Sequence, residues 1–352
     1  MPQGRVKLAF IGVGSMGQCA HLKNYAALDE CEVVALAELR CDVREKVAAR
    51  YGVPSVYENH EELIAEEQFD ALVCIQPFSR HGILIPEVLE AGVPLLIEKP
   101  VASSVRVGER ILDALERSKT FMMVAYHKRS DPATECAKAE VDRLKESGEV
   151  GKMRYVRITM PPGDWIAGGF NDLIRGEEVT GLDTDPPPPD MDEETFRKYK
   201  TFVNYYIHQV NLMRHLLGES YRVTYAEKSQ ALLAVESIGG VAGVIEMAPY
   251  STSLDWRESV LVGFERGCVK LDLPAPLAAN RAGRVEIMRD PGDGKTPETV
   301  VPVMPPVHAM RRQAENFLKA VRGEAKPPCG AEEALEDLRV ARDYISLLQE
   351  KG

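Results

Sequence analysis

Residues 6–25, VKLAFIGVGSMGQCAHLKNY, decide the fold of this chain. An apolar run predicts a buried β-strand, three glycines follow with the spacing G-x-G-x-x-G, and a helical pattern begins directly after them. In such a strand, turn and helix unit the first glycine permits the tight turn, the second lets the backbone approach a pyrophosphate, and the third lets helix and strand pack closely. The stretch therefore predicts a dinucleotide site with the phosphates at a helix N-terminus. The residues assigned to the phosphates are Gly12, Gly14, Ser15, Met16 and Gly17.

An acidic residue at the end of the next predicted strand supports this interpretation. Glu38 closes residues 31–38, CEVVALAE, about 20 residues after Gly17, which is the spacing expected of the acid that binds a ribose 2′-hydroxyl. Because a carboxylate repels a 2′-phosphate, Glu38 favours NAD over NADP. Arg40 and Arg44 could still bind that phosphate, so NADP remains an alternative.

The composition excludes several classes of partner. The 352 residues carry a formal net charge of -11 and give a pI near 5.3, whereas nucleic acids and anionic membranes attract a basic surface. The seven cysteines form no C-x-x-C pair and their number is odd, so neither a zinc knuckle nor a disulfide framework is indicated, and we expect no bound metal. We find no signal peptide and no apolar run of membrane-spanning length. We therefore expect a cytoplasmic protein with a small-molecule partner.

The pattern of predicted elements changes along the chain. In the first 130 residues short apolar runs alternate with amphipathic helical patterns, which is typical of a parallel sheet with helices on both faces. After about residue 150 strand-like runs follow one another with little helix between them, which predicts a mostly antiparallel sheet. The predicted strands lie in residues 6–13, 31–38, 71–77, 94–100 and 121–127, and then in 151–160, 221–237, 240–248, 258–273 and 283–289. The fold class is thus α/β, with a doubly wound domain over 1–130, an α+β domain over 131–352, and two closing helices of which one could pack back on the first domain.

A lysine at the end of the predicted strand 94–100 is a candidate for chemistry. Lys99, in the turn EKP, follows the carboxyl end of a parallel strand, where ligands bind in doubly wound sheets. It could orient a hydroxyl, or transfer a proton if burial or another cation lowers its pKa. A solvated lysine in a turn that starts a helix is an equal alternative.

Residues 203–218, VNYYIHQVNLMRHLLG, predict a largely buried helix with one polar stripe. Asn204, His208, Asn211 and His215 fall on one narrow face between apolar flanks. The stripe faces either a ligand or a seam of hydrogen-bonded core groups.

Taken together, these features resemble the Gfo/Idh/MocA family, the family of glucose-fructose oxidoreductase and inositol dehydrogenase. The glycine turn, the acid after the second strand, CIQPFSRHG at residues 74–82, EKP and the helix with His208 all match, and the resemblance covers nearly the whole chain. It implies an N-terminal Rossmann domain that binds NAD or NADP and a second domain whose large open sheet supports a homodimer or homotetramer. It also implies an active site in the cleft between the domains, acting on a secondary alcohol or ketone of a sugar, cyclitol or sugar derivative.

The resemblance assigns roles to individual residues. Lys99 matches the catalytic lysine of the family and His208 its histidine on the first long helix of the second domain. The other matched positions are Gln76, Pro77, His81 and Glu98 beside the cofactor, and Tyr126 and Arg129 beside the substrate.

The chain departs from the family pattern four residues before that histidine. Many members have Asp there, and this chain has Asn204, which cannot accept a proton but can hydrogen-bond the substrate or fix the tautomer of His208. Tyr126, Tyr205 and Tyr206 are alternative proton carriers, although aromatic packing is an equal explanation for the last two.

A second departure is the long segment 161–200, which is rich in proline, glycine and acid. It either covers the cleft, with Asp164 and Trp165 as substrate contacts, or is a solvated insertion or an oligomer contact.

The sequence therefore predicts an NAD(P)-dependent dehydrogenase or reductase. His208, held by Asn204 and aided by Lys99, would move the hydroxyl proton while a hydride passes between nicotinamide and the carbinol carbon. Two alternatives keep the fold: a redox-neutral glycosidase that uses NAD, and a non-catalytic nucleotide sensor, against which the presence of both Lys99 and His208 argues.

Overall fold

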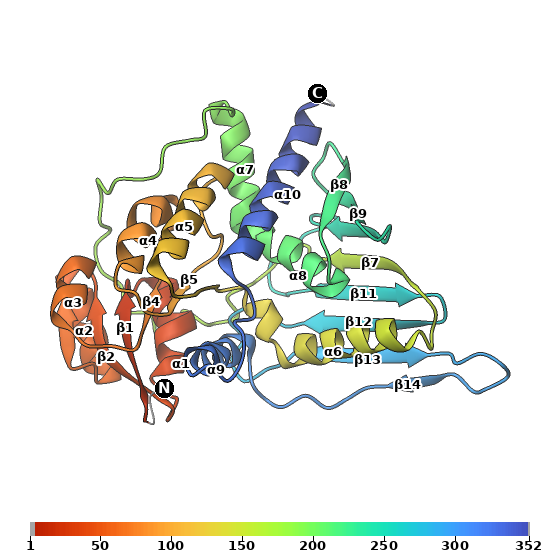
Figure 1. Ribbon diagram of the computed structural model, residues 1–352, viewed down its shortest axis with the longest axis horizontal. Helices are drawn as coiled ribbons and strands as arrows, with labels where there is room; N and C mark the ends of the chain where they lie inside the picture. The colour runs from red at the N-terminus through yellow and green to blue at the C-terminus, as the bar shows by residue number, and fades with distance from the viewer. Residues whose placement is uncertain (1–3, 351–352) are drawn as a thin grey trace. The chain divides into compact units, whose positions relative to one another are not determined.

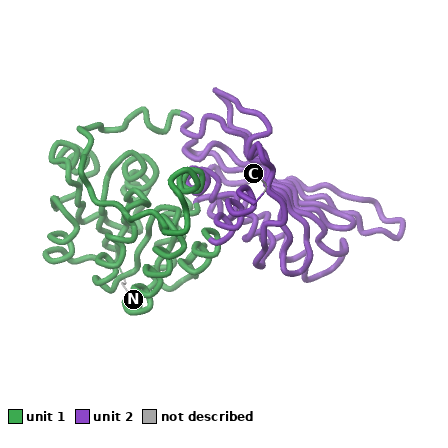
Figure 2. The backbone as a smooth tube through the Cα atoms, turned by 90° about the horizontal axis from the view of Figure 1, so that it is seen from above, with its two compact units in different colours: residues 1–126, 168–200, 310–338 green, residues 127–167, 201–309, 339–352 purple. Residues whose placement is uncertain are grey.

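The computed structural model describes residues 4–350, and these form two compact units (Figure 2). The first unit contains the described residues up to Tyr126 together with residues 168–200 and 310–338. The second contains residues 127–167 and 201–309 and the chain from Arg339 onward. These units group segments that are far apart in the sequence, whereas the domain boundary expected at residue 130 divides the chain once. That boundary stays a prediction.

A parallel sheet of six strands, counted over the described residues, organises the first unit (Figure 1). The strands are β1 (Val6–Ile11), β2 (Cys31–Ala37), β3 (Ser55–Tyr57), β4 (Ala71–Cys74), β5 (Leu95–Ile97) and β6 (Met122–Val124). All neighbours pair in parallel, in the order β3-β2-β1-β4-β5-β6. The order reverses between β1 and β4, so ligands of such a sheet bind outside the carboxyl ends of these strands.

The helices that precede Tyr126 in the first unit begin and end at residues that favour helix starts and helix ends. They are η1 (Gly17–Leu22), α1 (Lys23–Tyr25), α2 (Cys41–Tyr51), α3 (His60–Glu66), η2 (Phe78–Arg80), α4 (His81–Leu89) and α5 (Val105–Ser118). Ser104 caps α5 by accepting a hydrogen bond from the Val107 amide, and α2 ends at Gly52, whose φ of 68° is left-handed.

The C-terminal part of the chain completes the core of the first unit. α9 (Ala309–Val321) lies beside α1 in Figure 1, and its fully buried Phe317 packs edge-on against Tyr25, with ring centroids 6.4 Å apart. The start of α10 (Ala331–Glu350) follows a backbone hydrogen bond of 3.1 Å from Val124 N to Cys329 O. Residues 310–338 are thus part of the sheet's own packing, not an appendage.

No helix or strand lies between Thr159 and Glu193 in the described chain, so the loop predicted over residues 161–200 is a loop as far as Asp192, and residues 193–200 are helical instead. Figure 1 shows it as a coil that runs along the outside of the first unit before α7 (Glu193–Tyr205) begins. Its part from residue 168 onward belongs to the first unit.

A larger sheet organises the second unit. Its described strands are β7 (Met153–Thr159), β8 (Tyr221–Ala226), β9 (Leu232–Ser237), β10 (Ala242–Glu246), β11 (Glu258–Phe264), β12 (Gly267–Leu273), β13 (Arg284–Arg289) and β14 (Glu298–Val300), in the order β14-β13-β12-β11-β7-β10-β9-β8. Only β7 and β10 pair in parallel among them, so the sheet is mostly antiparallel, as predicted.

Two helices of the second unit cover one face of this sheet. α6 (Pro132–Ser147) packs on β12 and β13, and α8 (Ile207–Leu217) packs on β7 and β10. The short η3 (His127–Ser130) precedes α6, whose first turn is capped by Asp131.

The predicted α/β fold class, a doubly wound parallel sheet followed by a large, mostly antiparallel one, is confirmed. The short strands β3 and β14 were not predicted, because three residues are too few to show a period. Within residues 4–350 every helix is too short or too polar to cross a bilayer.

Candidate functional site

The glycine turn has the shape that a dinucleotide requires. Gly12 has a φ of 91°, and a Cβ there would lie 2.4 Å from the Ile75 carbonyl oxygen. A Cβ on Gly17 would lie 2.5 Å from the Gly12 carbonyl oxygen, so helix and strand can approach closely only without a side chain. At Gly14 the nearest atom to an added Cβ is Arg40 Nη2, at 3.9 Å. The turn therefore has no room for a side chain at Gly12 and Gly17 but has free space at Gly14, where a pyrophosphate would meet the backbone. These residues fit the cofactor.

Ser15 and Met16 lead into the helix after this turn. Ser15 is exposed, whereas Met16 is half-buried against the core of the first unit. Their backbone lies at the electropositive end of the helix, which favours an anionic group. The helix begins with a π-helical turn, a form that often marks functional sites.

Glu38 is buried directly after β2 and is held by two neighbours. Its carboxylate accepts hydrogen bonds from Arg40 Nε at 2.8 Å, from Arg40 Nη2 at 2.9 Å and from the Val13 amide at 3.1 Å. Burial alone would raise the pKa of Glu38, but the bonds from Arg40 and Val13 lower it below its usual value. Arg44 donates to the carbonyl oxygen of Glu38 at 2.7 Å. Both arginines that could bind a 2′-phosphate are thus engaged around an ionised carboxylate.

The segment after β4 is held by His81, whose side chain is fully buried. His81 Nδ1 lies 3.1 Å from the Val101 carbonyl oxygen and Nε2 lies 3.2 Å from that of Gln76. Burial lowers the pKa of His81, and the two carbonyl oxygens only partly offset this effect. The Gln76 amide donates to the Ile11 carbonyl oxygen at 3.4 Å, while Pro77 precedes η2. His81 therefore links the loops after β4 and β5, and can act on a cofactor only through them.

Glu98 and Lys99 follow β5 at the same edge of the sheet as the glycine turn. Glu98 Oε1 lies 2.7 Å from His21 Nε2, and its Oε2 accepts a hydrogen bond of 3.0 Å from the Lys99 amide. Burial would raise the pKa of Glu98, but the hydrogen bond and charge of His21, together with Lys99, lower it. Sequence reasoning missed His21; its place one helical turn after Gly17 was the available signal.

The helix predicted over residues 203–218 is in fact two helices. α7 ends at Tyr205, α8 begins at Ile207, and Tyr206 between them has φ of −99° and ψ of −1°. The Tyr206 hydroxyl donates to the Met247 carbonyl oxygen at 2.8 Å, and burial raises the pKa of this phenol. Tyr205 and Tyr206 pack edge to face with centroids 4.9 Å apart. The break between α7 and α8 thus lies at a residue whose side chain is hydrogen-bonded to Met247 in a distant part of the sequence.

This break divides the polar stripe. Asn204 is exposed on α7, whereas His208 is half-buried on α8. The ring of His208 meets the ring of His127 edge to face, at 4.6 Å between centroids. Sequence reasoning placed no weight on His127, because the strand pattern put it on the face opposite Tyr126.

The far half of the stripe is a hydrogen-bonded seam. Asn211 is buried, and its Oδ1 accepts a hydrogen bond of 2.6 Å from Arg129 Nε. Burial, and then the charges of Arg129 and Lys138, lower the pKa of His215 to about 2. Arg129 itself is buried, so the group expected to contact substrate is bonded to Asn211 on α8.

The remaining predicted substrate residues have different surroundings. Tyr126 is buried at the end of the first unit's N-terminal segment. Asp164 Oδ1 accepts hydrogen bonds from the amides of Ile166 at 3.0 Å and Ala167 at 3.1 Å. Trp165 is half-buried next to it.

A buried charged network beside His208 escaped sequence reasoning. Lys128 is paired with Glu258, which also accepts a hydrogen bond of 2.7 Å from Gln209. The Lys128 ammonium lies 5.5 Å from the centroid of the Trp256 ring, within reach of a cation–π interaction. No local pattern marks this network, because its members come from residues far apart in the chain.

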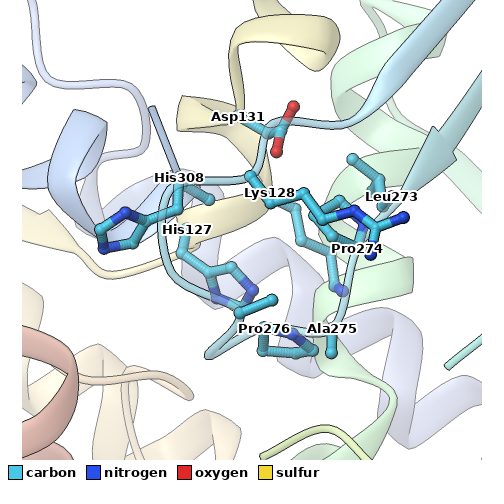
Figure 3. Close-up of a pocket in the computed structure, with 11 residues that line it drawn as sticks. His127, Lys128, Asp131, Leu273, Pro274, Ala275, Pro276 and His308 are labelled. Carbon is cyan, nitrogen blue, oxygen red and sulfur yellow. The ribbon is translucent and has the colours of Figure 1, made fainter. Parts of the chain in front are cut away.

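Two cavities in the second unit differ in what they can hold. The one in Figure 3 lies among His127, Lys128, Asp131 and His308, and its volume of about 10 Å³ suits a single water molecule. A groove of about 670 Å³ is lined by Asp164, Trp256 and other residues of the second unit, and lies in the range of small-molecule sites. Of the predicted substrate residues, Asp164 lines the groove.

One group of potential metal ligands occurs among the described residues: His60, Glu61 and Glu87. The two ring nitrogens of His60 face different carboxylates, Glu61 at 3.1 Å and Glu87 at 2.9 Å. Opposite sides of one imidazole cannot bind the same ion, so this arrangement is a histidine with one carboxylate at each ring nitrogen.

Known proteins resemble this chain in sequence. The family model described as "Oxidoreductase family, NAD-binding Rossmann fold" matches residues 6–126. An inositol 2-dehydrogenase/D-chiro-inositol 3-dehydrogenase of Shouchella clausii (strain KSM-K16) is 30% identical over 304 residues, which cover 81% of this chain and 78% of that protein. The chain belongs to the Gfo/Idh/MocA family of oxidoreductases.

Further comparisons agree with membership of the Gfo/Idh/MocA family. A scyllo-inositol 2-dehydrogenase (NAD(+)) of Bacillus subtilis (strain 168) is 25% identical over 259 residues, or 69% of this chain and 67% of that one. The structure titled levoglucosan dehydrogenase, in complex with NADH and levoglucosan, shares the fold with a TM-score of 0.73 and 16% identity, covering 99% of this chain and 98% of that one. The predicted family, the oxidoreductase class and NAD as the cofactor are confirmed. The roles of individual Gfo/Idh/MocA site residues stay predictions.

Proposed function

We propose that this protein is an NAD-dependent dehydrogenase or reductase of a secondary alcohol on a cyclitol, sugar or sugar derivative. The observation that carries the proposal is the position of Lys99: it follows β5 at the carboxyl edge of the sheet, where the open glycine turn and Glu38 also lie. The names of the relatives, inositol dehydrogenases and a levoglucosan dehydrogenase, support the substrate class.

The geometry of the first unit supports the cofactor-binding roles that we propose. The backbone of Gly14, Ser15 and Met16 would hold the pyrophosphate, and Glu38 would accept a hydrogen bond from a ribose hydroxyl. The loops that His81 ties together, with Gln76 and Pro77 in one and Lys99 in the other, would border the nicotinamide. Since Arg40 is bound by Glu38, we propose NAD as the preferred cofactor, with NADP as the alternative.

The chemical roles divide between the two units. Bound NAD supplies the hydride acceptor, or as NADH the donor. Lys99 orients the substrate hydroxyl, His208 removes or returns its proton, and Asn204 hydrogen-bonds a neighbouring substrate oxygen. We assign Asp164, in the groove of the second unit, to a hydroxyl of the substrate, with Trp165, Tyr126 and Arg129 as further candidates.

We also propose a cytoplasmic homo-oligomer. All seven cysteines lie in the described chain and are free thiols, as a reducing compartment would keep them. On the sheet face away from α6 and α8, the side chains of Tyr155, Val244 and Leu261 are half-exposed, which suits contact with a second copy.

The test is an activity assay with matched variants. Purified protein with NAD+ should form NADH with at least one member of a panel of inositols, levoglucosan and aldoses, and Lys99→Ala and His208→Ala should each lower kcat by a factor of about 10² to 10⁴. The controls are Lys46→Ala, at an exposed pair on α2, and His60→Ala, which should keep parental rates.

Two results would count against the proposal. Parental turnover in both Lys99→Ala and His208→Ala would remove the catalytic assignment. Release of an aglycone from a glycoside without net NADH would support the redox-neutral glycosidase in its place.

A further inference from the structure

Residues 172–185, here called the strap, are fixed to the first unit by hydrogen bonds near both ends. The Asp172 carbonyl oxygen accepts a hydrogen bond from Arg50 on α2, and the Asp183 carbonyl oxygen accepts one of 3.1 Å from Arg80. Further on, the buried Asp185 accepts hydrogen bonds of 3.1 Å from the Gly82 amide and from the Ser103 hydroxyl. The strap thus runs from α2 to the loops after β4 and β5 and is held near its two ends, while residues 175–184 between them are exposed.

Gln18 joins the strap to the glycine turn. Its side-chain amide donates to the Val13 carbonyl oxygen at 2.8 Å and to the Ile174 carbonyl oxygen at 3.0 Å, and its Oε1 accepts from the Ile174 amide at 3.0 Å. Gln18 is 1% exposed and lies in the π-helical turn. Because a buried amide that loses its hydrogen-bond partners destabilises the folded state, the strap and the turn stabilise each other.

Gly176 brings the strap against the start of α2. A Cβ on Gly176 would lie 2.4 Å from Val43 Cγ2 and 3.0 Å from Asp42 Oδ1. Val43 is fully buried and its branched side chain has little freedom to move, so the strap would have to shift. The start of α2 follows Arg40, the partner of Glu38, so the strap flanks both the phosphate turn and the ribose acid.

We propose that Gln18 and the strap are positioning elements of the dinucleotide site, and that they slow release of the cofactor. Through Gln18 the strap fixes the Val13 carbonyl between Gly12 and Gly14, and the Val13 amide in turn is bonded to Glu38. When the strap loses these hydrogen bonds, the backbone of the glycine turn becomes more mobile. The turn then binds a pyrophosphate more weakly. The inference rests on the proposed function only in requiring that NAD(H) binds.

The experiment measures how fast NADH leaves the full-length protein. Bound NADH is chased with excess NAD+ in a stopped-flow instrument, and its fluorescence gives the dissociation rate without any substrate. Gln18→Met removes the side-chain amide that bonds the strap to the turn, and Gly176→Ala displaces the strap without changing any residue of the glycine turn or its helix. Each should release NADH about tenfold faster, as loss of about 1.4 kcal/mol would produce.

The controls use the same substitutions at positions that lack these contacts. Gln68→Met changes an exposed glutamine, and Gly263→Ala adds a Cβ whose nearest neighbour lies 3.7 Å away, at ordinary contact distance. Both should release NADH at the parental rate, and thermal melting should establish that all four variants are folded.

The outcomes separate this inference from the proposed function. If either Gln18→Met or Gly176→Ala is folded and releases NADH at the parental rate, the inference is wrong. If the parent binds no NADH, both the inference and the proposed function fail. If the variants release NADH faster but no alcohol on the panel is oxidised, the inference stands and the proposed substrate class fails.

Discussion

The carboxylate of Glu38 connects two parts of the cofactor site at the scale of one residue. It accepts hydrogen bonds from both Arg40 and the Val13 amide, so it holds the arginine side chain and the glycine turn in place at once. The proposed preference for NAD would therefore depend on the pair of Glu38 and Arg40, and not only on the repulsion between an acid and a 2′-phosphate.

Replacing this residue should change the cofactor preference. Glu38→Ser removes the charge that repels a 2′-phosphate and frees Arg40 to bind it, so we expect the ratio of NADP to NAD affinity to rise by about two orders of magnitude. Fluorescence titration with NADH and NADPH measures both affinities. Glu32→Ser, at an exposed position on β2, is the control and should keep the parental ratio. Equal losses of affinity for both cofactors in Glu38→Ser would contradict the assignment.

Asp131 makes a second prediction at the residue scale, about stability and pH. It caps α6 by accepting from the Ala133 amide at 2.8 Å and also accepts from Gly283 at 3.0 Å, yet burial outweighs these bonds and raises its pKa to about 6. Because the unfolded value is roughly 3.9, the folded protein binds the proton more tightly. Its contribution to stability is fully present below that unfolded value and is lost as the pH rises to about 6.

Asp131→Asn keeps an oxygen acceptor for the cap but does not titrate. The free energy of unfolding, measured with urea across this pH window, should therefore fall less steeply with pH in the variant than in the parent. Asp113→Asn, at an exposed site on α5, should retain the parental slope. A parental slope in Asp131→Asn would show that another group carries the pH dependence.

At the scale of elements, the sequence predicts what depends on neighbours along the chain. Except for the short β3, the strands of the parallel sheet lie in largely apolar runs, and the glycine turn has fixed spacing, so both could be predicted from the sequence. The apolar face predicted for residues 203–218 is buried as expected, at Val203, Ile207, Val210 and Met213.

Elements that depend on distant partners could not be predicted in the same way. The break at Tyr206 occurs where its hydroxyl meets the Met247 carbonyl oxygen, which is 41 residues away in sequence. Helical periodicity contains no trace of that bond. The pairing of Lys128 with Glu258 spans 130 residues and could not be predicted for the same reason. The sequence therefore predicted one half of the candidate site, the glycine turn with Glu38 and Lys99. It did not predict the surroundings of His208.

At the scale of the whole molecule, the first unit is assembled from three stretches of chain. Phe317 from α9 packs against Tyr25 and Phe121, and the Val124 amide donates to the Cys329 carbonyl oxygen. A fragment that ends near residue 130 would expose both rings and leave that edge amide without its acceptor.

We therefore expect residues 1–130 alone to lack a cooperative thermal transition. Loss of a buried aromatic ring typically costs about 3 to 5 kcal/mol, which is a large part of the stability of one domain. Joining residues 310–338 to this fragment through a flexible linker should restore cooperative melting, as measured by circular dichroism. Cooperative melting of the fragment alone would contradict this account of the core.

The three-part construction of the first unit also fixes an order of events during synthesis. A ribosome adds roughly 5 to 20 residues each second, so the sheet of residues 6–126 emerges on the order of ten to forty seconds before α9 can join it. Over that interval Tyr25 and Phe121 lack the ring that covers them in the finished protein. Until α9 has been synthesised, the nascent chain therefore exposes apolar surface that a chaperone could shield.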